Sequence, residues 1–277
     1  MINQNSPEYE KETVILAQID LTTGSIPKTL LRFAFPMICG NLLQQLYNVA
    51  DTLIVGRFLG SDALGAVGSS YTLMTFLTSI LLGLCMGSGA LFSVCWGQRD
   101  LARLRRQTHA AFELIAVCTV VLNAAAFLLL DAMKTLLSVP AEVWPLMRSY
   151  LFVIFLGIPA IILYNLVSGV IRSLGDSRTP IYFLVLSSLL NVALDLLAVA
   201  VLGMGVEGPA WATVISQAIS GLLCLAIMGK RYPVLRFRPG ELRPSRTHIT
   251  RLFAIGVPMG LQYSVTAIGT IVVQTAV

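Results

Sequence analysis

Two carboxylates, Asp51 and Asp195, stand inside long apolar stretches of the sequence. Asp195 follows Asn191 by one helical turn. Three polar residues precede Asp51 at helical spacing and share one face with it: Gln44, Tyr47 and Asn48. A carboxylate at membrane depth is costly and normally faces the protein interior or a watery cavity. The sequence therefore raises the question of what these two side chains face.

Helical rise gives each polar residue a depth. At about 1.5 Å per residue, Asp51 lies roughly 9 Å, Asp195 roughly 12 Å and Thr213 roughly 8 Å from the outer ends of their spans. Carboxylate, amide and hydroxyl oxygens in one layer can share a proton or bind Na⁺. We therefore predict a site for H⁺ or Na⁺, with any sodium ion held by Asp51 and Asp195. Alternatively, each aspartate reaches to water by itself, and Asn191 and Thr213 only join helices.

The composition indicates a polytopic α-helical membrane protein. Hydrophobic residues make up 56% and charged residues 12% of the 277 residues, with a mean hydropathy of +0.80. A soluble domain is about one quarter charged, and the apolar runs of roughly 20 residues or more match a hydrocarbon core about 30 Å thick. Six spans and a truncated seventh are expected, at residues 29–55, 63–96, 109–130, 144–171, 180–202, 209–228 and 252–277. A short polar turn is expected at residues 56–62 and a basic connector at 97–107.

The basic residues predict the orientation. All but three of the 19 Lys and Arg residues fall in the N-terminal segment or in the connectors after the second, fourth and sixth spans. The exceptions are Arg57, Lys134 and Arg148. This bias places the N-terminus in the cytoplasm, so the net charge of +5 does not argue for nucleic acid as a partner. Residues 1–28 lack a signal-peptide pattern and are expected to form a cytoplasmic tail before an uncleaved first span.

A short repeat suggests that the chain holds half of a larger protein. Pro36-Met37 recurs as Pro258-Met259, each time where a span begins after a basic segment. We interpret residues 29–228 as a six-helix lobe, 229–251 as a basic cytoplasmic loop, and 252–277 as the first helix of a second, parallel lobe that is missing.

Other sequence patterns are less informative about chemistry. The five cysteines lie in apolar runs and are expected to pack in the core, without a C-x-x-C metal pattern. Gly83-x-x-x-Gly87 is typical of a close helix–helix approach in a bilayer. No nucleotide-binding loop, zinc spacing or hydrolase motif appears. We therefore expect no enzyme activity and no cofactor other than the coupling ion.

Taken in order, several short motifs resemble those of the multidrug and toxic compound extrusion (MATE) transporters, from about Thr22 to the end of the chain. The matching residues are Pro36, Gln44, Asp51-Thr52, Gly56, Leu59-Gly60, Gly83, Gly97, Asp100, Arg172-Ser173, Gly175-Asp176, Pro180, Asn191 and Asp195. The resemblance implies twelve helices in two six-helix lobes. It also implies export of cationic or amphipathic drugs or toxic metabolites in exchange for H⁺ or Na⁺ across a bacterial-type inner membrane, with membrane lipid around the helices.

The resemblance also implies roles for individual residues. Asp51, Asn191, Asp195 and Thr213 match a cation site in the N-terminal lobe. Tyr47 belongs with that site, while Gln44 and Asn165 match polar positions of the substrate cavity. Pro36 matches a proposed hinge of the first helix, and a proline weakens a helix by removing one backbone donor.

The same residues leave three other functions to compare with transport. A flippase for lipid-linked saccharides or peptidoglycan precursors, from the same superfamily, would need several basic residues for a diphosphate, and the spans contain almost none. An intramembrane aspartyl protease would need a Gly-x-Gly-Asp context, which neither aspartate has. A non-catalytic role as a membrane assembly subunit would suit half of a transporter.

Overall fold

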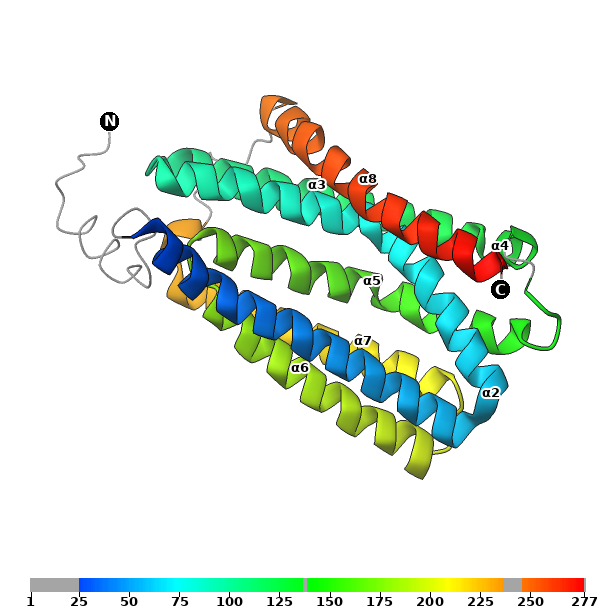
Figure 1. Cartoon of the computed structure of the whole chain (residues 1–277). Coiled ribbons are helices and arrows are strands. Elements are labelled where there is room, and N and C mark those ends of the chain that lie inside the picture. Colours follow the sequence, from blue (N-terminus) through cyan, green and yellow to red (C-terminus); the bar gives the residue numbers. More distant parts are fainter. Residues whose placement is uncertain (1–24, 137–138, 237–245, 277) are drawn as a thin grey trace.

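The computed structural model describes residues 25–136, 139–236 and 246–276, and the described chain is helical throughout (Figure 1). Its elements are α2 (Ile26–Gly97), α3 (Leu101–Leu128), α4 (Leu130–Leu136), α5 (Trp144–Ser173), α6 (Arg178–Leu196), the π-helical turn η1 (Leu197–Val201), α7 (Glu207–Arg231), the 3₁₀ turn η2 (Pro233–Leu235) and α8 (Arg246–Ala276). Within this part of the chain, five helices are long and apolar enough to cross a membrane: α2, α3, α5, α6 with η1, and α7. The predicted all-α membrane fold is confirmed.

Helix α2 contains two of the predicted spans. Its 72 residues run out along the bundle and turn back at Gly60, as Figure 1 shows. Gly60 has φ 86° and ψ −174°, a conformation that glycine adopts and other residues avoid. The prediction of a polar turn over residues 56–62 was therefore too wide, since the helix is interrupted at one residue.

The basic connector predicted at residues 97–107 is also shorter in the structure. Helix α3 begins at Leu101, because the Asp100 side chain caps it by accepting a hydrogen bond from the Arg103 backbone N–H at 3.0 Å. Helix α8 begins at Arg246, inside the predicted inter-lobe loop. Residues 1–24 of the predicted tail, residues 237–245 of that loop and Val277 lie outside the described part of the chain.

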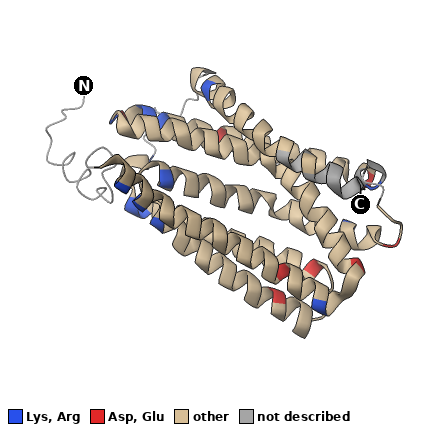
Figure 2. Cartoon of the chain, viewed as in Figure 1, with Lys and Arg blue, Asp and Glu red and all other residues tan. Residues whose placement is uncertain are grey.

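The bundle has a basic end. Lys and Arg gather where α2 begins and where α5 and α7 end, whereas most acidic residues lie toward the other end (Figure 2). We call the end of the bundle where these Lys and Arg residues gather the basic end.

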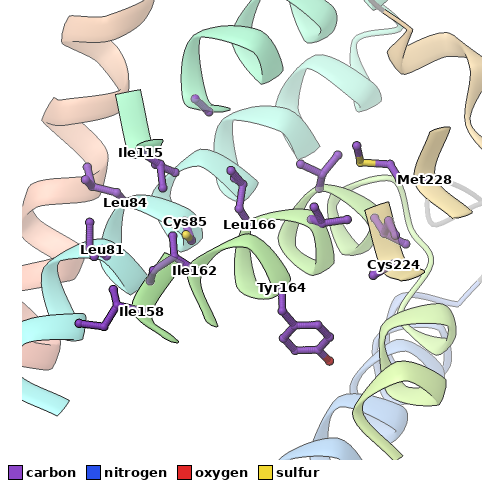
Figure 3. Close-up of a cluster of buried hydrophobic side chains, with 14 of the residues drawn as sticks. Leu81, Leu84, Cys85, Ile115, Ile158, Ile162, Tyr164, Leu166, Cys224 and Met228 are labelled. Carbon is purple, nitrogen blue, oxygen red and sulfur yellow. The ribbon is translucent and has the colours of Figure 1, made fainter. Parts of the chain in front are cut away.

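A core of buried apolar side chains from α2, α3, α5 and α7 joins the helices (Figure 3). Asn123 contributes to this packing, because its side-chain amide donates to the Phe155 carbonyl across α3 and α5 at 2.8 Å.

Helices α2 and α8 cross with almost no side-chain atoms between their backbones. A Cβ atom added to Gly83 would lie 2.1 Å from the Gly260 nitrogen, and one added to Gly87 would lie 2.7 Å from the Gly256 Cα. One turn further along, the hydroxyl oxygens of Ser79 and Ser264 are 2.6 Å apart. The three pairs follow one antiparallel register. Close packing at Gly83-x-x-x-Gly87, predicted from the sequence, is confirmed, and its partner is a second glycine pair that flanks Pro258.

This crossing predicts a position-specific effect of a single methyl group. Gly87→Ala should lower the free energy of unfolding by about 1–3 kcal/mol, because α8 must move to admit the added atom. Gly89→Ala is the matched control, since its Cβ would meet the Gly169 carbonyl oxygen at an ordinary 3.7 Å. The thermal midpoints of both variants, measured in detergent, test this packing. Equal midpoints would contradict it.

Candidate functional site

Asp51 of α2 and Asp195 of α6 face each other. Their carboxyl groups are within interaction distance, although they come from spans far apart in the sequence. Asp195 is fully buried. Among the described residues, no donor reaches Asp51 Oδ1 or either carboxyl oxygen of Asp195. Each carboxyl therefore faces an acceptor, and a shared proton or a cation between the two would satisfy both.

Asn191 and Thr213 link α6 to α7 close to these carboxyls. The Asn191 side-chain amide donates to the Thr213 hydroxyl at 3.2 Å, and its carbonyl oxygen has no hydrogen-bond partner within the described chain. The oxygens offered here are hard ligands, which fit H⁺ or Na⁺. No group of three or more His, Cys, Asp or Glu side chains suited to a metal ion occurs among the described residues.

Tyr150 of α5 belongs to this layer and was not predicted from the sequence. The buried phenol lies within electrostatic reach of both Asp51 and Asp195. Tyr47, which was predicted, lies near Asp51 from within α2. Its depth matches that of the carboxyl groups, because it stands six residues after the start of α5 at Trp144, or roughly 9 Å along the helix. Depth alone does not show that its side chain faces inward.

A cavity of about 220 Å³ extends from this layer toward the basic end. Thr213 and Tyr47 line it near the carboxyl groups, with Gln44 and Asn165 further along. Arg172 also lines it, although the sequence predicted a connector at this residue. The structure thus brings the predicted cavity residues Gln44 and Asn165 to one space beside the predicted ion site.

Pro36 lies within α2, which continues as a helix through it. The residue of α2 with non-helical dihedral angles is Gly60, at the opposite end of the bundle. A hinge at Pro36 stays a prediction.

A hydrogen-bonded network fastens the basic ends of α5, α6 and α7 around Asp176. This buried carboxylate accepts the Tyr232 hydroxyl at 2.6 Å, the Thr179 hydroxyl at 2.5 Å and the backbone N–H groups of Arg178 and Thr179 at 3.0 Å. Arg231 donates to the Thr179 hydroxyl at 3.2 Å and lies 4.0 Å from the carboxylate. The first turn of α6 is thereby joined to the end of α7.

These bonds shift the acidity of both partners. Burial raises the pKa of Asp176, but the hydrogen bonds from Thr179, Tyr232 and the backbone outweigh it and hold the pKa below its usual value. Burial and the bond to Asp176 raise the pKa of Tyr232. The network is therefore fully formed with an ionised Asp176 and a neutral Tyr232.

Comparison with known proteins gives a consistent result. The MatE family model matches residues 36–197. The probable multidrug resistance protein YpnP of Bacillus subtilis is 32% identical over 93% of this chain and 58% of its own length. The FAD transporter of Shewanella oneidensis is 22% identical over 92% of this chain and 57% of its own length. The chain thus spans a little over half the length of these curated relatives.

Solved structures agree with this result. A MOP superfamily transporter from Pyrococcus furiosus, described as having a binding pocket of reverse polarity, superimposes with a TM-score of 0.82 at 26% identity, over 91% of this chain and 55% of that one. A MATE crystal structure in complex with MaD3S gives a TM-score of 0.81 at 26% identity, over 91% and 56%.

The Asp176 network predicts an acid-dependent contribution to stability. Tyr232→Phe should lower the free energy of unfolding by about 1.5–3 kcal/mol, as expected for a bond to a charged group. Because the pKa of Asp176 is lowered in the folded protein, its contribution is full above about pH 4 and declines as the pH falls through that lowered pKa. Thermal unfolding at several pH values measures both effects.

The control for this variant is Tyr182→Phe, which alters an exposed tyrosine. If the two variants unfold alike at neutral pH, the network does not stabilise the fold.

Proposed function

The chain belongs to the MatE family of transporters, and on that premise we propose that it forms the ion-coupling part of a secondary antiporter. The antiporter exports amphipathic small molecules in exchange for H⁺ or Na⁺. The observation that carries the proposal is the contact between Asp51 and Asp195 beside a polar cavity.

The coupling follows from competition for the carboxylates. While ionised, they favour a cationic or polar group of the cargo at the Thr213 end of the cavity. Once they bind H⁺ or Na⁺, that attraction is lost and the cargo is released. A bend at Pro36 would move the first half of α2, which carries Asp51 and part of the cavity lining.

The chemistry of the cavity supports small amphipathic cargo. Tyrosine rings and amide side chains line it, and among its described lining residues a single one, Arg172, is charged. One guanidinium is few for a diphosphate, which argues against a flippase for lipid-linked precursors. The relatives' names include both a multidrug resistance protein and an FAD transporter, so the cargo need not be purely cationic.

We place the protein in a bacterial-type inner membrane with its N-terminus in the cytoplasm. The gathering of Lys and Arg at the basic end supports this orientation (Figure 2). The cavity of about 220 Å³ is smaller than the roughly 300–1,000 Å³ of sites for drug-sized ligands. A second lobe facing this cavity would complete such a site.

Neutralising either carboxylate tests the proposal. In cells that express the native gene product containing this chain, Asp51→Asn and Asp195→Asn should each slow ethidium efflux by about tenfold or more. Each substitution removes a carboxylate for which the cargo and the ion compete, so ion binding no longer drives release of the cargo. Efflux measured with the H⁺ and Na⁺ gradients collapsed separately identifies the ion.

Asp62→Asn is the matched control, since this exposed aspartate lies just after Gly60 and accepts a hydrogen bond from the Ser61 hydroxyl. It should leave efflux unchanged. Normal efflux in both the Asp51 and Asp195 variants would refute the ion site.

A further inference from the structure

Arg172 places a positive charge at the basic end of the cavity. It stands in the last turn of α5 and lines the cavity wall. Within the described chain its guanidinium forms no hydrogen bond or ion pair. The nearest acidic residue in sequence, Asp176, is already held by Tyr232, Thr179 and two backbone donors. The charge of Arg172 is therefore directed at the cavity and not at a protein carboxylate.

Ser177 supplies a second group at the same end. Ser177 is among the residues that line the cavity and is 1% exposed, and its buried hydroxyl has no hydrogen-bond partner among the described residues. A buried hydroxyl without a partner is costly. A guanidinium and an unpartnered hydroxyl on residues that line one cavity are donors of the kind that a carboxylate or phosphate group accepts from.

The cavity therefore has a positive charge at its basic end and two carboxyl groups near its Thr213 end. No Asp or Glu is among its described lining residues, whereas the contacting carboxyl groups lie just beyond its Thr213 end. Arg172 lies near Cys224 of α7, which follows Thr213 by eleven residues, or roughly 16 Å of helix. We propose that Arg172 and Ser177 form a subsite for the anionic group of a zwitterionic, amphipathic cargo molecule.

The zwitterionic character rests on the proposed antiport. A purely anionic cargo would bind better once the carboxyls had taken up a proton, so that ion and cargo would move together. A cargo with a cationic group toward Asp51 and Asp195 competes with the ion, while its anionic group binds Arg172. A cargo with opposite charges at its two ends thus matches the charges at the two ends of the cavity and also competes with the coupling ion.

Two dyes that differ by one methyl ester test the subsite. Rhodamine 110 has a free carboxylate and is zwitterionic at neutral pH, whereas its methyl ester rhodamine 123 is a cation. Binding is measured by fluorescence anisotropy on the native gene product in phosphatidylcholine nanodiscs. Arg172→Gln should weaken rhodamine 110 binding by about tenfold and change rhodamine 123 binding by less than about twofold, because a charge-assisted contact is lost for one dye alone.

Three further variants separate charge from folding. Arg172→Lys should keep part of the preference for rhodamine 110, and Ser177→Ala should weaken that dye alone. Arg178→Gln, which removes an exposed arginine from the same end, should affect neither dye.

The proposal is overturned if Arg172→Gln weakens both dyes equally or leaves rhodamine 110 binding unchanged. Weaker rhodamine 110 binding in nanodiscs that contain phosphatidylglycerol would instead assign the subsite to a lipid headgroup and overturn its assignment to cargo. Efflux of rhodamine 123 from cells tests the proposed antiport separately, because the binding preference is measured without transport.

Discussion

Two carboxyl groups in contact inside apolar helices impose the main constraint on this fold. Both cannot remain charged without a cation between them, and in the described chain no donor reaches Asp51 Oδ1 or either carboxyl oxygen of Asp195. Asp51 comes from α2 and Asp195 from α6, so the two helices must pack side by side at this depth. Tyr150 of α5 and the Asn191–Thr213 bond between α6 and α7 complete the same layer. Four helices, α2, α5, α6 and α7, thus contribute side chains to the layer around the two carboxyl groups.

Much of this arrangement could be predicted, because helix rise is fixed and a bilayer limits where polar residues stand. Depth along each span already put Asp51, Asp195 and Thr213 in one layer. The glycine spacing at Gly83 and Gly87 indicated a close crossing, but not its partner, because the direction in which a helix face points depends on its neighbours. The turn around Gly60 was predicted to be longer than it is, because polar residues at a membrane surface can also belong to a helix.

Arg172 and Tyr150 were missed for a physical reason. A basic residue at the end of a span predicts topology, yet a long side chain can bend back along the helix and reach the interior. Likewise, a tyrosine close to a span end suits the membrane interface, and only packing reveals that Tyr150 is buried near two carboxyl groups. In Figure 3, Tyr164 extends away from the buried cluster, and its hydroxyl donates to the Pro180 carbonyl at 3.0 Å. For side chains with an apolar body and a polar tip, the tertiary structure is needed to tell whether they lie at the membrane surface or in the protein interior.

The crossing of α2 and α8 has a consequence for biosynthesis. Gly83 and Gly87 leave the ribosome long before Gly260 and Gly256 do, by roughly 10–35 s at ordinary translation rates. During that interval the bare backbone of α2 has no glycine partner, and lipid chains or a neighbouring helix must cover it. When α8 emerges it displaces that cover, so its insertion closes a surface that the earlier helices had left open.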